Sequence, residues 1–369
     1  MKHNKLIAVL VVLLTLTFII SGCGDGSEVD TEDVAETDEE TGVDDEVEVE
    51  DEPTGEVEVE LSLSDTNPVG HVLLRATDNF AEELESRSNG AVEVIRYRHR
   101  ELYDEFGQYD AVEAGTLDMA VHSGVMIGQV SSVLEFISGF NTLGLYDDWE
   151  HYYRVMDNPR IQELAEQEFE RMNQKLLGIV SYGSSLCVST APIHEPADFE
   201  GLRVIAGGEP QSRMFAAMGG TPVEMAMTEM YMALERGTVD ASGTGAGFAY
   251  NNAIYEVAPN IIFFNDAPMT SFFFAINKDT YDSLSSEHQE LILELSEEMV
   301  EYTRTGAVAD DEEDTQLLIE AGANVIFWEE EQKEELREIT YPIMLDIFNN
   351  RVGEELTAEL FEILEEERL

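Results

Sequence analysis

Few side chains in this 369-residue chain have the types and spacing that catalysis or metal binding requires. His122 directly precedes Ser123, which could suggest a nucleophile beside its base. No glycine elbow flanks this serine, and adjacent residues on a strand face opposite ways. The seven histidines and Cys187 show no metal-ligand spacing. We therefore predict no catalytic residue, no metal site and no cofactor, and we expect a protein that is not an enzyme.

A glycine-rich segment at 243–247 could suggest a nucleotide-binding loop. The third glycine of a G-x-G-x-x-G pattern would have to occupy the position of Phe248, so the pattern fails. We interpret the segment as a turn that lines a binding cleft.

The elements that would position such residues alternate between strand and helix. Apolar residues recur at helical spacing from Leu73 to Leu84, between segments with strand patterns. This order is typical of a largely parallel sheet, in which ligands bind at the carboxyl ends of strands. The order therefore places Thr66 and Ser123 beside a ligand. The predicted strands span 57–63, 92–95 and 119–121, and the predicted helices span 73–84 and 109–114.

The same order repeats in the second part of the chain, and long acidic amphipathic helices follow it. We therefore predict an α/β fold of two lobes, with late helices that cross back over both. The first lobe is expected to comprise 57–181 plus about 263–303, and the second about 182–262 plus 304–369. Further strands are predicted at 177–180, 201–205, 222–223, 272–277 and 323–327, and further helices at 212–218, 229–235, 285–320 and 330–367.

The chain is strongly acidic, with a formal net charge of −58. From residue 61 onward, 59 acidic side chains face 18 basic ones, spread over many segments. Nucleic acid is therefore excluded as a partner, because its phosphates would be repelled. Cation binding would be one explanation of the charge. We favour a solvated surface adapted to high salt, where self-repulsion is screened over about 3 Å at 1 M.

The start of the chain has the pattern of a secretory signal at 1–22, with two lysines before an apolar run that is too short to span a membrane. The sequence Ile20-Ser21-Gly22-Cys23 resembles the bacterial lipobox. We therefore expect lipidation of Cys23 and anchoring to the cell membrane. An ordinary signal peptide, with Cys23 incidental, is the alternative. The acidic segment at 23–56 lacks aromatic residues and is predicted to be a disordered tether.

A family resemblance rests on several stretches in order. These are 111–120 (AVEAGTLDMA), 192–202 (PIHEPADFEGL), 218–223 (MGGTPV) and 229–240 (EMYMALERGTVD), of which the last is the most specific. With them, nearly all of 57–345 resembles the solute-binding proteins of tripartite ATP-independent periplasmic (TRAP) transporters, the dicarboxylate-binding-protein (DctP) family. The sequence around Ala241 is most similar to the branch that takes 2-oxo acids.

The resemblance implies a clamshell of the class II periplasmic-binding type that closes about a hinge on a small molecule. The closed form would then dock on the TRAP membrane permease subunits. A lipoprotein that presents its closed form to a membrane signalling protein would use the same clamshell. Ligand sensing therefore stays open as the alternative function.

The ligand site departs from the family pattern. The family typically has an arginine that binds the ligand carboxylate where this chain has Ile205, and Arg203 would share that strand face. Ser242 and Thr244 stand where the 2-oxo acid branch has an acidic residue and a tryptophan, and Ser123 stands near an acidic position of the sialic-acid branch. Since burying a carboxylate without a cation is costly, we hypothesise a neutral, zwitterionic or cationic ligand, or a wider pocket.

Aromatic rings are enriched in ligand pockets, and Tyr182 and Phe248 flank the predicted crossings between the lobes. We expect both to contact the ligand, as we do His71 at the start of the first resembling stretch. The complete set of candidate ligand-binding residues is Thr66, His71, Ser123, Tyr182, Arg203, Ile205, Ser242, Thr244 and Phe248.

Overall fold

The computed structural model describes residues 56–139, 144–268 and 270–368. The predicted signal peptide, Cys23 and all but the last residue of the predicted tether lie outside these ranges. None of the helices within them is both long and apolar enough to span a bilayer.

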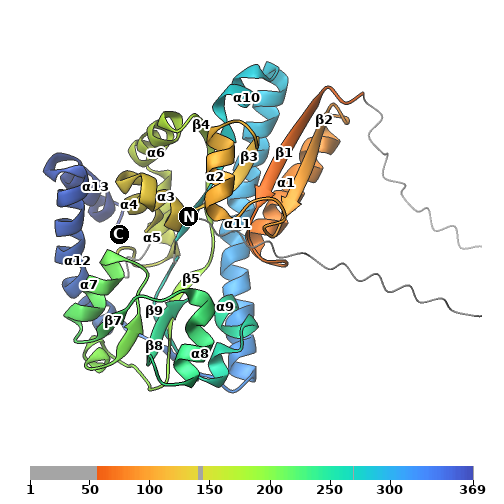
Figure 1. Cartoon of the computed structure of the whole chain (residues 1–369). Coiled ribbons are helices and arrows are strands. Elements are labelled where there is room, and N and C mark those ends of the chain that lie inside the picture. Colours follow the sequence, from red (N-terminus) through yellow and green to blue (C-terminus); the bar gives the residue numbers. More distant parts are fainter. Residues whose placement is uncertain (1–55, 140–143, 269, 369) are drawn as a thin grey trace, which may run out of the picture. The chain divides into compact units, whose positions relative to one another are not determined.

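A five-stranded sheet forms the first lobe, in the order β2-β1-β3-β10-β4 (Figure 1). β1, β2 and β3 run parallel, whereas β10 is antiparallel to both β3 and β4. The predicted strands and helices of this part are therefore confirmed, most of them with longer bounds, whereas β1 is shifted by two residues from the predicted 57–63. They are β1 (Val59–Asp65), α1 (Val72–Arg87), β2 (Val92–Arg98), α2 (Glu105–Glu113), β3 (Met119–Ser123), β4 (Gln174–Ser181) and β10 (Ser271–Asn277).

Four short helices between β3 and β4 were not predicted from the sequence. Asp148 and Asn158 accept hydrogen bonds from backbone N–H groups in the first turns of two of them, so the start signals are present. The helices are α3 (Gly124–Val130), α4 (Ser132–Ser138), α5 (Trp149–Asp157) and α6 (Pro159–Arg171).

A six-stranded sheet forms the second lobe, in the order β11-β9-β5-β8-β6-β7. β6, β7 and β8 run parallel, as do β9 and β11, and β5 is antiparallel to its neighbours β8 and β9. The elements are β5 (Ser184–Ser189), η1 (Pro196–Phe199), β6 (Arg203–Ile205), α7 (Glu209–Ala217), β7 (Thr221–Val223), η2 (Met227–Glu229), α8 (Met230–Glu235), β8 (Ala241–Thr244), α9 (Ala246–Asn251), η3 (Ile254–Glu256), β9 (Asn260–Pro268) and β11 (Asn324–Phe327).

The chain crosses between the sheets where β4 leads into β5 and where β9 leads into β10. Because β4 ends at this crossing, the parallel strands β1, β2 and β3 also have their carboxyl ends on that side. β5 begins at the crossing and runs opposite to its neighbours, so β6, β7, β8, β9 and β11 likewise end there. Both sheets therefore present carboxyl ends to the same crossing, which is where α/β proteins bind ligands.

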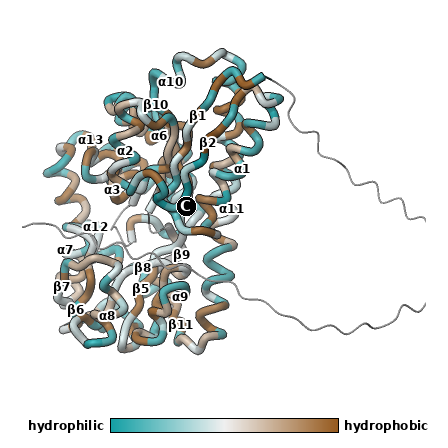
Figure 2. Tube along the Cα trace, turned by 45° about the vertical axis from the view of Figure 1, so that its right-hand side comes forward, coloured by the Kyte–Doolittle hydropathy of each residue, from teal (hydrophilic) through white to brown (hydrophobic). Residues whose placement is uncertain are grey.

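Long helices connect the two lobes a third time (Figure 1). After α10 (Lys278–Ser283), α11 (Ser286–Glu320) packs Leu295 into the core of the first lobe and Leu318 into that of the second. Hydrophobic and hydrophilic segments alternate along α11 (Figure 2). Gly306 allows its close approach to α1, because a Cβ there would lie 2.6 Å from a methyl of Val72.

The structure corrects two sequence predictions about the last part of the chain. A single helix was predicted for 330–367, but Gly353, with φ of 87°, separates α12 (Glu330–Val352) from α13 (Glu354–Glu366). The predicted lobe boundaries also differ from the packing. Residues 263–268 belong to β9 of the second sheet, and Phe348 of α12 and Leu360 of α13 pack in the core of the first lobe.

Candidate functional site

The candidate residues of the first lobe lie at or just after the carboxyl ends of its strands. Thr66 is buried in the loop after β1. Asp65 fixes this loop, because its Oδ1 accepts hydrogen bonds from the Asn67 backbone N–H at 2.8 Å and from Asn67 Nδ2 at 2.7 Å. Burial raises the pKa of Asp65. Ser123 ends β3 and precedes α3, where its side chain makes no capping hydrogen bond.

Three rings lie in a row at the crossing, those of His71, Tyr182 and Phe272, and we call them the ring ladder. The His71 and Tyr182 rings lie 4.4 Å apart between centroids, and Tyr182 stacks on Phe272 at 4.8 Å. Phe272 is the register partner of Ser123, so the ladder adjoins the end of β3. Burial lowers the pKa of His71 to about 4, and its Nδ1 accepts a hydrogen bond from the Leu73 backbone N–H. His71 is therefore neutral at pH 7 and cannot serve as a cation for an anionic ligand.

The candidate residues of the second lobe lie on β6, β8 and the start of α9. Ile205 is the register partner of Ser242, and its side chain packs in an apolar core beneath α8. Thr244 ends β8, and its buried hydroxyl has no hydrogen-bond partner among the described residues. Phe248, in α9, packs half-buried against the same core. Ile205 and Thr244 end β6 and β8, and Phe248 follows in α9, so these residues line one end of the second sheet.

Arg203 lies at the opposite end of the second sheet from the crossing, as the first residue of β6. Its guanidinium binds the Asp240 carboxylate in a two-point contact, with Nε–Oδ2 at 2.9 Å and Nη2–Oδ1 at 2.8 Å. This arginine lowers the pKa of Asp240. The prediction that Arg203 contacts the ligand is therefore corrected, since the strand direction turns it away from the crossing and Asp240 occupies its donors.

Two acidic side chains at the crossing were missed by the sequence reasoning. Asp311 of α11 accepts a hydrogen bond from the Ser184 backbone N–H at 2.6 Å, at the first residue of β5. Burial raises the pKa of Asp311 to about 7. Asp314 lies one turn further along, beside Gly247, and burial raises its pKa to about 6. No sequence motif marked them, because they stand among many other acidic residues of a long helix.

Arginines near the ends of β1 and β2 are already paired with carboxylates. Nη2 of Arg75 lies 2.8 Å from Asp310, and Nε of Arg98 lies 2.6 Å from Asp78. Arg100 is paired with a neighbouring glutamate in the same way. An anionic ligand at this edge would thus have to compete with existing ion pairs for a cation.

His122 and Ser123 do not form a nucleophile–base pair. The His122 ring is fully buried and its Nε2 lies 2.8 Å from the Gln174 side-chain oxygen, and burial lowers its pKa to about 4. Across the residues that the structure describes, no group of three or more histidine, cysteine or acidic side chains could hold a metal ion.

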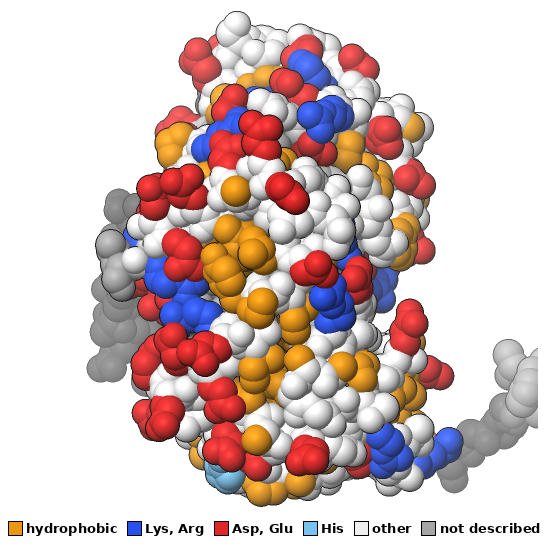
Figure 3. Space-filling model, turned by 90° about the vertical axis from the view of Figure 1, so that its left-hand side faces the viewer, with side chains coloured by type: hydrophobic (Ala, Val, Ile, Leu, Met, Phe, Trp, Pro, Cys, Tyr) orange, Lys and Arg blue, Asp and Glu red, His pale blue; other side chains and the backbone are white. Residues whose placement is uncertain are grey.

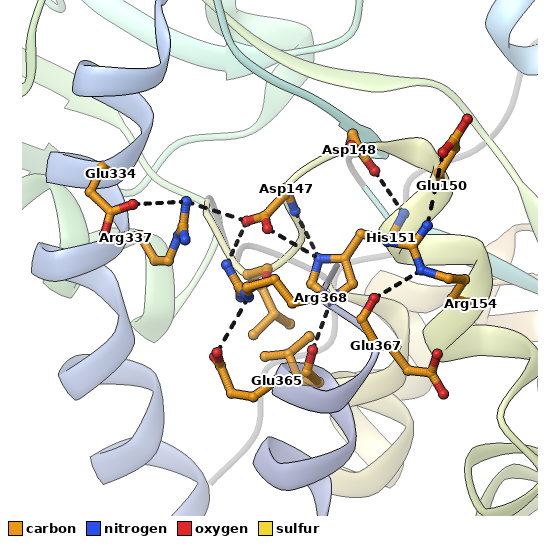
Figure 4. Close-up of polar contacts among 12 residues, drawn as sticks. Asp147, Asp148, Glu150, His151, Arg154, Glu334, Arg337, Glu365, Glu367 and Arg368 are labelled. Atoms are coloured by element: carbon orange, nitrogen blue, oxygen red, sulfur yellow. Dashed lines mark hydrogen bonds and ion pairs between the residues drawn. The ribbon is translucent and has the colours of Figure 1, made fainter.

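A separate cluster of charges surrounds Asp147 (Figure 4). Its carboxylate lies 2.5 Å from Arg368 near the end of the chain and 3.6 Å from Arg337 of α12. Its backbone N–H donates to Nδ1 of His151, whose Nε2 lies 2.9 Å from the Leu364 carbonyl, so the ring is neutral and carries its proton on Nε2. The cluster connects residues near the end of the chain to the start of α5.

Acidic side chains are scattered over the face that carries α12 and α13, and hydrophobic ones gather across its middle (Figure 3). On this face, at least, the negative charge is dispersed over the surface. No patch of a single charge marks a further site there.

The chain matches a known protein family. The family model of bacterial extracellular solute-binding proteins, family 7 (DctP), matches residues 63–351. The chain is 24% identical over 253 residues to the 2,3-diketo-L-gulonate-binding periplasmic protein YiaO of Escherichia coli, which covers 68% of this chain and 76% of that protein. It is 24% identical over 282 residues to the C4-dicarboxylate-binding periplasmic protein DctP of Rhodobacter capsulatus, covering 76% of this chain and 83% of that one.

Solved structures share the fold. A TRAP periplasmic solute-binding protein from Ochrobactrum anthropi matches with a TM-score of 0.78 at 23% identity, covering 85% of this chain and 96% of that one. One from Haemophilus influenzae with bound L-gulonate matches with a TM-score of 0.72 at 19% identity, covering 84% and 100%. The predicted two-lobed α/β fold is thereby confirmed.

Proposed function

This chain belongs to bacterial extracellular solute-binding protein family 7, and on that premise we propose that it is the extracytoplasmic solute-binding protein of a TRAP transporter. It captures a small organic solute between its lobes by hinge closure and delivers it to a membrane permease. It acts as a receptor and not as an enzyme. The observation that carries the proposal is the family match over 63–351, in a chain whose two sheets both end at one crossing.

The ligand contacts of this proposal are Thr66, Ser123 and the ring ladder in the first lobe, with Ser242, Thr244 and Phe248 in the second. Relatives with solved structures hold carboxylates such as L-gulonate and succinate. In this chain Ile205 replaces the family arginine and is 3% exposed within an apolar core. The proposed ligand is therefore a small solute whose recognition does not depend on that arginine.

The binding test is a thermal-shift screen of the purified protein against organic acids, sugars, polyols and amino acids. A ligand at 100 times its Kd should stabilise the folded state by about 2.7 kcal/mol. Small-angle X-ray scattering of the same samples should show a smaller radius of gyration with ligand, as hinge closure requires. A screen without any stabilising compound, or binding without a change in scattering, contradicts the proposal.

The proposed anchor is a lipid on Cys23, at the end of the lipobox-like sequence. Cys23→Ser should release the protein from the membrane fraction and remove the lipid mass from the mature chain. Cys187→Ser is the matched control, because this cysteine is buried in the second lobe. Membrane retention of Cys23→Ser would show that another element anchors the chain.

Adaptation to high salt is part of the proposal, because 59 acidic side chains from residue 61 onward repel one another. The melting temperature should rise as NaCl increases from low to molar concentration. A melting temperature that does not depend on the NaCl concentration contradicts adaptation to high salt. Ligand sensing for a membrane signalling protein, the alternative function, has no observation of its own in its favour.

A further inference from the structure

The first turn of α7 carries an amide, that of Gln211, which is not among the ligand contacts proposed above. Gln211 follows closely after the carboxyl end of β6. Its side-chain oxygen accepts a hydrogen bond from the Gly207 backbone N–H at 2.8 Å. Only the oxygen of the amide can accept this bond, so the position of the amide nitrogen is fixed as well.

The amide nitrogen of Gln211 points across the end of the second sheet. It lies 3.2 Å from the point where a Cβ on Gly243 would stand. Gly243 belongs to β8, whose neighbour Ser242 is the register partner of Ile205 on β6. The residue Gln211 is half-buried, and of its side-chain atoms only the oxygen has a hydrogen-bond partner among the described residues. The amide therefore packs against the side-chain-free backbone of Gly243, and its two N–H groups donate to no described residue.

The charges around Gln211 disfavour an anion. Glu209, in the same turn, is paired with Arg351 at 3.1 Å and with Arg213 at 3.5 Å. Arg351 also contacts Glu135 of the first lobe, and Arg213 is shared with a carboxylate of α12. Neither arginine is free to neutralise a buried carboxylate, whereas a neutral oxygen needs only the two N–H donors.

We propose that Gln211 anchors the ligand to the second lobe by donating from Nε2 to an uncharged hydroxyl or carbonyl oxygen. The ligand class that fits is a polyol or neutral sugar. This inference rests on the proposed function, because it requires a solute between the lobes. Gln211 then occupies the role that the arginine holds in relatives, from the opposite face of the sheet to Ile205.

The experiment is isothermal titration calorimetry of the full chain with three pairs that differ in a carboxylate: D-galactose and D-galacturonate, D-glucose and D-glucuronate, and D-sorbitol and L-gulonate. We expect at least one neutral member to bind ten times more tightly than its acid. Gln211→Glu keeps an oxygen for the Gly207 N–H and loses both donors. The affinity for the neutral compound should therefore fall at least tenfold. Gln211→Met removes the donors without adding charge and should show the same loss.

Gln316→Ala is the control, since this glutamine is exposed on α11 and, within the described part of the chain, its side chain bonds only Glu320. Its affinity should equal that of the unaltered protein. Tighter binding of the acid in every pair that binds overturns the inference and leaves the proposed function intact. The inference is also overturned if none of the six compounds binds measurably. It is overturned as well if folded Gln211→Met binds the neutral compound within twofold of the affinity of the unaltered protein. The broader thermal-shift screen decides the proposed function separately.

Discussion

Replacing Asp311 by asparagine should stabilise the protein at pH 8 and have little effect at pH 4. An asparagine oxygen can still accept the hydrogen bond from the Ser184 N–H, so the variant removes the charge and keeps the contact. Burial is the main cause of the raised pKa, and Asp314 and Asp310 add repulsion. The Ser184 hydrogen bonds act in the opposite direction.

The magnitude follows from the shift. The pKa rises from 3.8 to about 7, and one pKa unit corresponds to about 1.4 kcal/mol, so ionised Asp311 destabilises the folded state by at most about 4 kcal/mol. Asp311 is half-buried, and solvent screening reduces this cost to about 2 kcal/mol. A raised carboxyl pKa means that the folded state holds the proton more tightly. The cost is thus absent below about pH 4, grows between pH 4 and 7, and is constant above.

The assay is urea unfolding of the unaltered protein and of Asp311→Asn at pH 4, 6 and 8. The difference in unfolding free energy should grow with pH and reach about 2 kcal/mol at pH 8. Glu312→Gln is the matched control, because Glu312 is the exposed neighbour on the same helix and should give no such trend. An Asp311→Asn benefit that is equal at pH 4 and pH 8, or a loss at pH 8, would refute the reasoning.

Three further predictions concern packing and ion pairs. Gly124→Ala should destabilise the first lobe by about 1–3 kcal/mol in urea unfolding, because its Cβ would lie 2.5 Å from the Ser271 carbonyl oxygen; Gly245→Ala, with its nearest atom at 3.8 Å, should not. Asp240→Asn should lower the melting temperature at pH 7, and less at pH 3, because the pKa of Asp240 is lowered by Arg203. Arg213 and Asp346 lie 2.9 Å apart, and reversing either charge alone should lower the unfolding free energy. Exchanging the two residues should restore most of that loss in urea unfolding, and no recovery would show that the pair contributes nothing.

Local periodicity was enough to predict most elements of the first lobe. The apolar positions from Leu73 to Leu84 are set by neighbours three and four residues apart, and the structure has α1 there. The stretch at 229–240 carried the family resemblance in the same way, since it is a continuous motif. The break of the last helix at Gly353 was missed although glycine is a local stop signal, because apolar residues recur at helical spacing on both sides of it.

The candidate site depended much more on distant contacts. The sequence alone placed Thr66, Ser123 and Thr244 near strand ends, because strand direction follows from the order of the elements. It could not show that Asp240, 37 positions after Arg203, accepts that arginine's hydrogen bonds. It also could not show that Gln211 lies over Gly243, or that Asp311 meets the start of β5.

The sequence by itself determined the family, most strands of the first sheet, the acidic balance and the presence of an apolar residue at position 205. These are properties of residue types and of spacings along a short stretch of chain. Only the tertiary structure decided which charges are paired, which donors are unused and which carboxyl groups are buried. Ion pairing and burial depend on segments that are far apart in the sequence and meet at one crossing, and no local pattern encodes the distance between them.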